Sequence, residues 1–160
     1  MNLVFMDLEA SGLGEASYPI EAAWVAADGE RQDSFLINPK SVAGWRYWDE
    51  HAEEVHGIDH NDLVREGISA QAACKRLNQH LQGCIVVTDA PSYDRFWLDR
   101  LYEACRCEPS FRVEGLDAIL NASQIAQFAQ EAEGAMRRHR ALADAEDLYR
   151  LAMKILRSDT

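Results

Sequence analysis

Two carboxylate residues stand two positions apart near the start of the chain, in segment 3–9, which reads LVFMDLE. The apolar residues around them are typical of a strand buried on both faces. Because alternate side chains of a strand share a face, Asp7 and Glu9 should project in the same direction. Two anions this close repel each other unless a cation lies between them, and their oxygens suit Mg²⁺ or Mn²⁺. The pair therefore indicates either a divalent-metal site or a strand end that frays into a solvated acidic turn.

A second acidic patch follows the apolar run 84–88, which reads CIVVT and predicts a central strand. Asp94 falls in the first turn of the helix expected after this strand. Residues so placed face the strand ends, where ligands bind in α/β sheets. The alternative is an aspartate that only stabilises the positive end of the helix dipole. Asp89 is a rival for the same role, and Asp99 is a more distant one.

The third patch combines Asp144 with His139, five residues before it. Asp144 is either a metal ligand or the N-cap of the last helix. His139 stands on an expected loop, and a histidine beside a metal-bound water is a natural general base at neutral pH. The arginines around it at positions 137, 138 and 140 either hold phosphates or balance local charge.

Aromatic residues gather just before the first expected helix, at Trp45, Tyr47 and Trp48. They either cap the hydrophobic core or stack on a nucleobase. The sequence leaves both interpretations open.

The chain has 160 residues, of which 48% are hydrophobic, and a formal net charge of −11. This length predicts a single domain over residues 1–160. The negative charge disfavours a protein that coats long nucleic acid through a basic surface, but it allows an enzyme that grips a chain end with bound divalent ions. No apolar run approaches the roughly 18 residues of a membrane span, and the N-terminus lacks a signal-peptide pattern. We therefore expect a cytoplasmic protein with no membrane partner.

The elements that must position these residues follow from hydrophobic periodicity and turn residues. Strands are expected over segments 3–9, 18–27, 31–37, 84–88 and 111–113. Helices are expected over segments 49–55 and 60–65, from 69 to a stop at Gly83, through 98–105, over most of 116–132 and from about Asp144 onward. The Asp28-Gly29 pair predicts a hairpin turn between the second and third strands. This order predicts a mixed α/β sheet with helices packed on it.

Taken together, the three acidic patches resemble the ordered motifs of the DEDDh 3′–5′ exonucleases, a family that includes proofreading subunits, ribonuclease T and oligoribonuclease. The motifs are Asp7-x-Glu9, Tyr93-Asp94 and His139-x4-Asp144, in that order and with suitable spacing. Supporting matches are the segments Ser11-Gly12-Leu13, Pro19-Ile20-Glu21 and His56-Gly57-Ile58. Relatives often carry His-Asn or a similar pair where this chain has Thr88-Asp89.

The resemblance implies a ribonuclease H-like fold, a five-stranded mixed sheet flanked by helices whose second strand is antiparallel to the others. It implies that two Mg²⁺ or Mn²⁺ ions are held by four carboxylates: Asp7, Glu9, Asp94 and Asp144. It makes His139 the general base and assigns substrate binding to four further residues: Ser11, Gly12, Leu13 and His56. The expected partners are 3′ ends of single-stranded DNA or RNA, and a homodimer is compatible with the resemblance.

Two other functions fit the same fold. One is a catalytically silent ribonuclease H-like module that only binds a partner. The other is a ribonuclease H-like endonuclease, which shares the carboxylates but does not need His139 at this spacing. The size of the products distinguishes all three functions.

Overall fold

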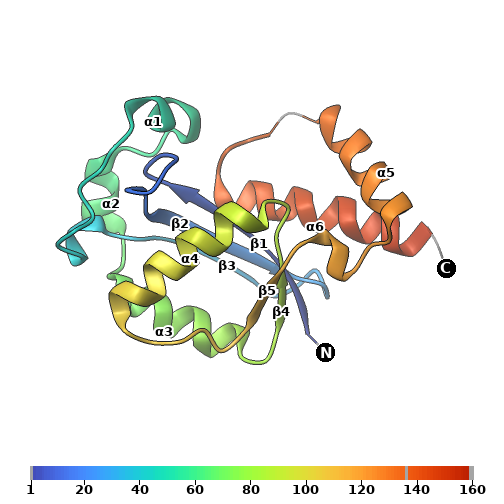
Figure 1. The fold of residues 1–160 in the computed structure, drawn as a ribbon, viewed down its shortest axis with the longest axis horizontal. Helices are drawn as coiled ribbons and strands as arrows, with labels where there is room; N and C mark the ends of the chain where they lie inside the picture. Colours follow the sequence, from blue (N-terminus) through green and yellow to red (C-terminus); the bar gives the residue numbers. More distant parts are fainter. Residues whose placement is uncertain (1, 136, 159–160) are drawn as a thin grey trace.

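A computed structural model describes residues 2–135 and 137–158 of the chain (Figure 1). Five strands form one sheet: β1 (Leu3–Ala10), β2 (Pro19–Ala26), β3 (Gln32–Leu36), β4 (Ile85–Val87) and β5 (Arg112–Glu114). Their order across the sheet is β3-β2-β1-β4-β5. β2 runs antiparallel to both β1 and β3, whereas β4 pairs parallel with β1 and with β5. The predicted ribonuclease H-like fold, with an antiparallel second strand, is confirmed.

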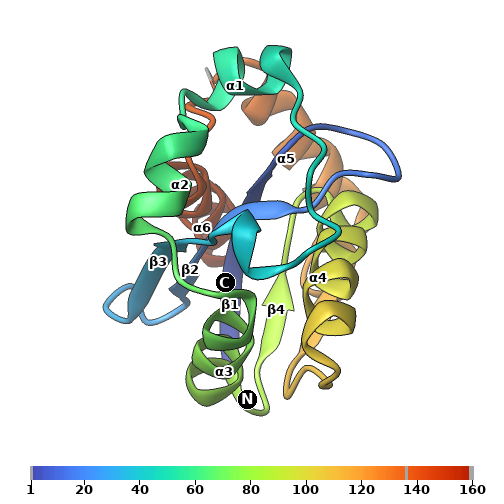
Figure 2. The same cartoon turned by 90° about the vertical axis from the view of Figure 1, so that its left-hand side faces the viewer.

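Helices cover both faces of this sheet and one of its ends. They are α1 (Glu50–His56), α2 (His60–Glu66), α3 (Ala70–Leu81), α4 (Pro91–Cys105), α5 (Ala122–Glu133) and α6 (Ala141–Ser158), with short 3₁₀ turns over Pro39–Ser41 and Leu116–Ala118. Figures 1 and 2 both show α1 at the end of the sheet where β1 finishes. No helix within residues 2–135 and 137–158 is long and apolar enough to cross a lipid bilayer.

The central strand β1 separates two hydrophobic layers. Val4, Met6 and Leu8 point into the larger core, which contains α3 and α4 residues such as Leu77. Phe5 points the other way, into a core formed with α5 and α6. Because side chains alternate along a strand, Asp7 and Glu9 follow Phe5 onto the α6 face. The strand thus directs both carboxylates toward the helix that carries Asp144.

The strands and helices differ from the expected bounds by one or two residues at most ends, with two larger differences. Segment 116–132 is not one helix but a 3₁₀ turn followed by α5, which has its own capping box at Asn121. The last helix begins at Ala141 rather than near Asp144. Its first backbone N–H donates to the Glu21 carboxylate of β2 at 2.8 Å, and hydrophobic periodicity does not reveal such a long-range cap.

Candidate metal centre

Carboxylates from β1, α4, α6 and the loop after β4 converge where β1 ends. Asp7, Glu9 and Asp144 each place an oxygen within 4.8 Å of the other two, and Asp7, Asp89 and Asp94 do the same. Asp7 belongs to both groups and is only 2% exposed. A carboxylate has two oxygens, so one residue shared by two groups is suited to two neighbouring cations.

Asp94 reaches the cluster from the first turn of α4, where Pro91 opens the helix. The Asp94 side chain is buried, and the Thr88 hydroxyl donates a hydrogen bond to its Oδ2. Thr88 in turn accepts the Ala90 N–H at 3.0 Å, so the turn between β4 and α4 fixes both side chains. This contact gives Thr88 a role in orienting Asp94.

Asp89 and Asp99 are the alternatives to Asp94 as a metal ligand, and the structure excludes only one of them. Asp89 is exposed, yet it belongs to the same carboxylate group as Asp94. Asp99 is exposed on α4 and lies in neither group. The geometry therefore removes Asp99 and keeps Asp89 as an alternative ligand.

Burial and mutual repulsion raise the pKa values of the central carboxylates. The pKa of Glu9 rises to about 8, first through burial and then through the charge of Asp144. The pKa of Asp94 rises to about 7 through burial, with Asp89 adding to it and the Thr88 hydrogen bond opposing it. Burial, followed by the charge of Asp94, raises the pKa of Asp7 well above its ordinary value. Protons or cations must therefore neutralise this cluster near neutral pH.

The donor set fits a divalent cation. Asp7 Oδ2 is buried and has no hydrogen-bond partner among the described residues, so one oxygen of the shared carboxylate is available. Hard carboxylate oxygens are the ligands that Mg²⁺ and Mn²⁺ prefer. The four ligands expected from the sequence all lie in the cluster: Asp7, Glu9, Asp94 and Asp144.

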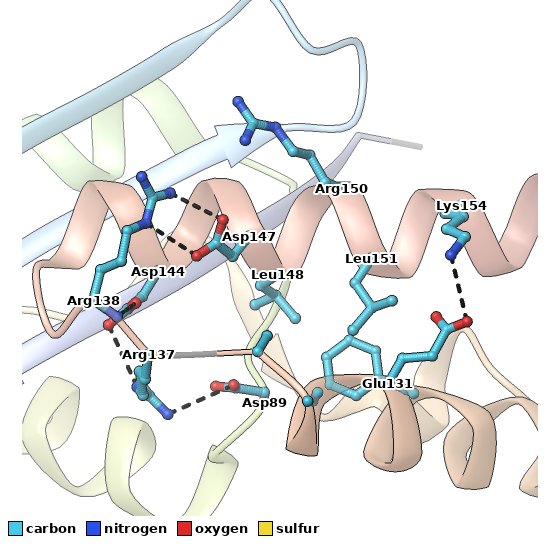
Figure 3. A pocket seen from close by; sticks show the side chains of 14 residues that line it. Asp89, Glu131, Arg137, Arg138, Asp144, Asp147, Leu148, Arg150, Leu151 and Lys154 are labelled. Atoms are coloured by element: carbon cyan, nitrogen blue, oxygen red, sulfur yellow. Dashed lines mark hydrogen bonds and ion pairs between the residues drawn. The ribbon is translucent and has the colours of Figure 1, made fainter.

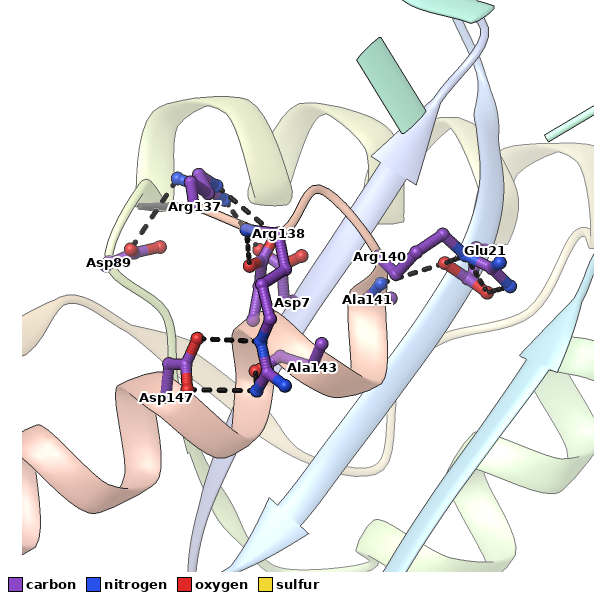
Figure 4. Close-up of polar contacts among 10 residues, drawn as sticks. Asp7, Glu21, Asp89, Arg137, Arg138, Arg140, Ala141, Ala143 and Asp147 are labelled. Atoms are coloured by element: carbon purple, nitrogen blue, oxygen red, sulfur yellow. Dashed lines mark hydrogen bonds and ion pairs between the residues drawn. The ribbon is translucent and has the colours of Figure 1, made fainter. Parts of the chain in front are cut away.

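The guanidinium of Arg137 lies among these carboxylates (Figures 3 and 4). Its Nη2 is 3.0 Å from Asp7 Oδ1, and its Nε is 3.4 Å from Asp144 Oδ2. A weaker contact of 3.8 Å joins Nη1 to Asp89 Oδ2. The sequence left the role of this arginine open, and the structure places it against the carboxylates.

The other two arginines of the loop hold its backbone. Arg138 pairs with Asp147 at 2.9 Å, and its backbone N–H donates to Asp144 Oδ1 at 3.0 Å. Arg140 binds the buried carboxylate of Glu21 in a bidentate pair, with its shortest contact at 2.7 Å (Figure 4). Glu21 was noted in the sequence only as a motif match, and its anchoring role requires the folded structure.

His139 stands between these two anchors with a left-handed backbone conformation, φ 58°. Its side chain is half-buried, and neither carboxylate group contains it. His139 lies close enough to His56 to contribute to lowering the pKa of that residue, whose main cause is burial. The structure thus places the expected general base on the loop between the Arg138 and Arg140 anchors and outside both carboxylate groups.

His56, at the end of α1, is a buried residue with an unsatisfied nitrogen. It is 5% exposed, and its Nδ1 accepts the Ile58 N–H at 3.0 Å. Its Nε2 is buried and finds no hydrogen-bond partner in the described part of the chain. With Nδ1 accepting, a neutral ring carries its proton on Nε2 and retains an unused donor.

The segment after β1 has three residues with different surroundings. Ser11 is fully buried, and its hydroxyl accepts the Tyr18 N–H at 3.2 Å, so this side chain holds the loop together. Gly12 has no room for a side chain, since a Cβ would lie 2.7 Å from Tyr47 Cε1. Leu13 is 64% exposed and is free to contact a ligand. Of the three expected substrate residues here, only Leu13 presents its side chain to solvent.

The aromatic residues at 45–48 divide between the two interpretations. Trp45 is buried and stacks on Tyr18, with ring centroids 5.1 Å apart, so it belongs to the core. Trp48 is partly buried and contacts His56 edge-on. Tyr47 is 41% exposed beside Gly12 and is the one of these three that is open to contact with a ligand.

No family model matches this chain, and no curated protein matches its sequence. Its fold is similar to that of solved exonuclease I structures. One apo structure has a TM-score of 0.75 and 14% identity, covering 98% of this chain and 42% of that one. E. coli exonuclease I in complex with a dA16 oligonucleotide has a TM-score of 0.73 and 14% identity, and the match covers 97% of this chain and 40% of that one. Exonuclease I from Methylocaldum szegediense has a TM-score of 0.71 and 14% identity, and the match covers 99% of this chain and 40% of that one.

This chain therefore spans about two fifths of the length of those exonuclease I chains. At such low identity the likeness concerns the fold. The chain is thus an α/β protein with a ribonuclease H-like fold similar to that of exonuclease I. It carries a cluster of carboxylates at the end of its central strand.

Proposed function

We propose that this protein is a metal-dependent 3′–5′ exonuclease that releases nucleoside monophosphates from single-stranded DNA or RNA. The observation that carries the proposal is the pair of carboxylate groups sharing Asp7 at the end of β1. Support for the substrate comes from exonuclease I, which has the same fold and has been solved with single-stranded oligonucleotides.

The four carboxylates would hold two Mg²⁺ or Mn²⁺ ions: Asp7, Glu9, Asp94 and Asp144. Ions bound there would lower the pKa of a coordinated water and stabilise the charge that develops on the scissile phosphate. Asp7 is shared by both groups, and Thr88 keeps Asp94 aimed at it. The chain's own contribution is to hold these oxygens in place without rearrangement.

His139 would accept the proton of the attacking water, because a neutral imidazole has a ring nitrogen that can act as a general base. Its loop is tied to β2 through Arg140 and to α6 through Arg138. These two contacts keep the left-handed backbone at His139 in place. The general base would thereby be held in place on the loop that precedes α6.

The 3′-terminal nucleotide would contact the segment Ser11-Gly12-Leu13 and His56. Leu13 offers an exposed apolar side chain for a base, and His56 offers the unused Nε2 donor. Ser11 and Gly12 would contribute by shaping the loop, since the Ser11 hydroxyl is hydrogen-bonded within the loop and Gly12 has no side chain.

A homodimer has no support from these observations. The single domain and the cytoplasmic location remain predictions.

The proposal is tested with 5′-labelled single-stranded DNA and RNA in Mg²⁺ or Mn²⁺, resolved by product length. We expect a ladder that shortens one nucleotide at a time and disappears with EDTA or with Asp7→Asn. Internal fragments at early times would instead identify an endonuclease. Binding without any cleavage would identify a silent binding module.

A further inference from the structure

Arg137 occupies the position where a cation is needed. Its guanidinium contacts Asp7, Asp144 and Asp89 over distances of 3.0 to 3.8 Å. Both Asp7 and Asp144 are almost fully buried, so these are ion pairs of low solvent exposure on the carboxylate side. Burial raises the pKa values of the carboxyls at Asp7, Glu9 and Asp94, and the positive charge of Arg137 partly opposes this rise. Arg137 therefore acts as a counter-ion for the whole cluster.

A guanidinium and a divalent ion compete for the same oxygens. Arg137 uses Oδ1 of Asp7, whereas Oδ2 of Asp7 has no partner among the described residues. The guanidinium and a divalent ion would also repel each other, so both cannot be held tightly by these carboxylates at once. We infer that Arg137 is an exchangeable counter-ion, which neutralises the carboxylates in the metal-free protein and must leave them when the ions bind.

The surroundings of Arg137 allow this exchange. The loop on its C-terminal side is held by the side chains of Arg138 and Arg140, neither of which binds the same carboxylate oxygens. Arg137 itself is half-exposed and lines a cavity of about 860 Å³ between α5 and α6 (Figure 3). The side chain can thus turn into open space without disturbing the core. Released there, it becomes a free cation beside the site and is available to a substrate phosphate.

This inference rests on the proposed function, because it needs the carboxylates to bind metal. It is tested without nucleic acid, by calorimetric titration of Mn²⁺ into the wild-type protein and into Arg137→Gln. We expect the variant to bind Mn²⁺ at least about tenfold more tightly, since no ion pair has to be broken. The metal-free variant should also melt at a lower temperature and gain more from Mn²⁺ than the wild type.

The matched control is Arg138→Gln, which removes the same charge from the next residue but breaks a pair with exposed Asp147. It should change Mn²⁺ affinity less than about threefold, because only the long-range field changes. If Arg137→Gln does not fold, Arg137→Lys is the substitute, because it keeps the charge but loses the planar guanidinium; it should bind Mn²⁺ more tightly than the wild type, and equal or weaker binding would overturn the inference.

The outcomes separate the inference from the proposed function. Equal Mn²⁺ affinity in the wild type and Arg137→Gln, or weaker binding by the variant, would overturn the counter-ion role and leave the metal site intact. Tighter binding by both arginine variants would show a general charge effect and would also overturn it. No Mn²⁺ binding by any of the proteins would contradict the proposed function itself.

Discussion

At the scale of single residues, the ligand role of Asp94 rests on its burial and on the hydroxyl that orients it. Thr88 donates to Asp94, and only 2% of Asp94 is exposed, whereas Asp89 lies at the surface. We predict that Asp94→Asn lowers kcat by roughly a thousandfold with the fold intact. Asp89→Asn should lower kcat far less, because an exposed carboxylate is a weaker candidate for a fixed metal ligand. Steady-state kinetics of the two variants decide between them, and a reversed order would make Asp89 the ligand.

The raised pKa values of Glu9 and Asp94 lead to a prediction about stability and pH. Both carboxyls hold their protons more tightly in the folded protein, with pKa values of about 8 and about 7 against ordinary values of 4.5 and 3.8. The folded state therefore binds more protons than the unfolded chain between these ordinary and raised pKa values, so stability falls as pH rises toward 8 and levels off above it. Melting temperatures in EDTA should decrease from about pH 5 to about pH 8 and change little at higher pH.

Two controls belong to this pH experiment. Glu9→Gln cannot ionise at this position, so its melting temperature should fall less over the same range. Mn²⁺ should reduce the decline in the wild type, because it favours the charged carboxylates. A melting temperature that rises with pH in EDTA would contradict the raised pKa values.

The contacts of Arg137 show why part of the site could not be predicted from sequence. Asp7 and Glu9 could be placed on one face because strand alternation is a local rule. The contact between Arg137 and Asp7 joins residues 130 positions apart, and no local pattern specifies it. The burial of His56 Nε2 without a hydrogen-bond partner among residues 2–135 and 137–158 likewise depends on the folded structure around α1.

At the scale of elements, β2 fixes the start of α6 through one buried carboxylate. Glu21 binds Arg140 in a bidentate pair and accepts the Ala141 N–H. We predict that Glu21→Ala destabilises the protein by about 2 kcal/mol, since it leaves a helix N-terminus without its acceptor and Arg140 without its partner. It should also lower kcat, because the loop that carries His139 loses an anchor. Urea unfolding and steady-state kinetics measure the two effects.

Asp147→Ala is the matched control for this helix anchor, because it removes the partner of Arg138 at a solvent-exposed pair. Such a pair contributes at most about 1 kcal/mol. If Glu21→Ala were no more destabilising than Asp147→Ala, the anchoring role of Glu21 would be wrong.

Elements defined by local signals were predicted well, and elements completed by distant contacts were not. The apolar runs located all five strands, and Ser69 caps α3 at the expected place. The predicted start of α6 was too late in the sequence because Glu21, which caps this helix, lies on β2, far from α6 along the chain. Segment 116–132 was predicted as mostly helical because its apolar spacing continues through the turn that separates the 3₁₀ segment from α5.

At the scale of the whole molecule, a net charge of −11 limits how nucleic acid can bind. Few phosphate contacts are possible without a basic track, so affinity should depend on the terminal nucleotides. We predict that this chain cuts short single strands at least as well as long ones and that its rate depends only weakly on salt. Rates on strands of graded length, at two salt concentrations, test this. Processive digestion of long strands by this chain would refute it.

The central claim is that the carboxylate cluster removes nucleotides from the 3′ end with bound metal. The most direct measurement follows a single-stranded oligonucleotide labelled in its 3′-terminal nucleotide, with Mn²⁺, in the wild type and in Asp7→Asn. The account predicts that the label leaves first, as a mononucleotide, and that Asp7→Asn abolishes this release. Label appearing first in longer fragments, or released equally by Asp7→Asn, would contradict the account.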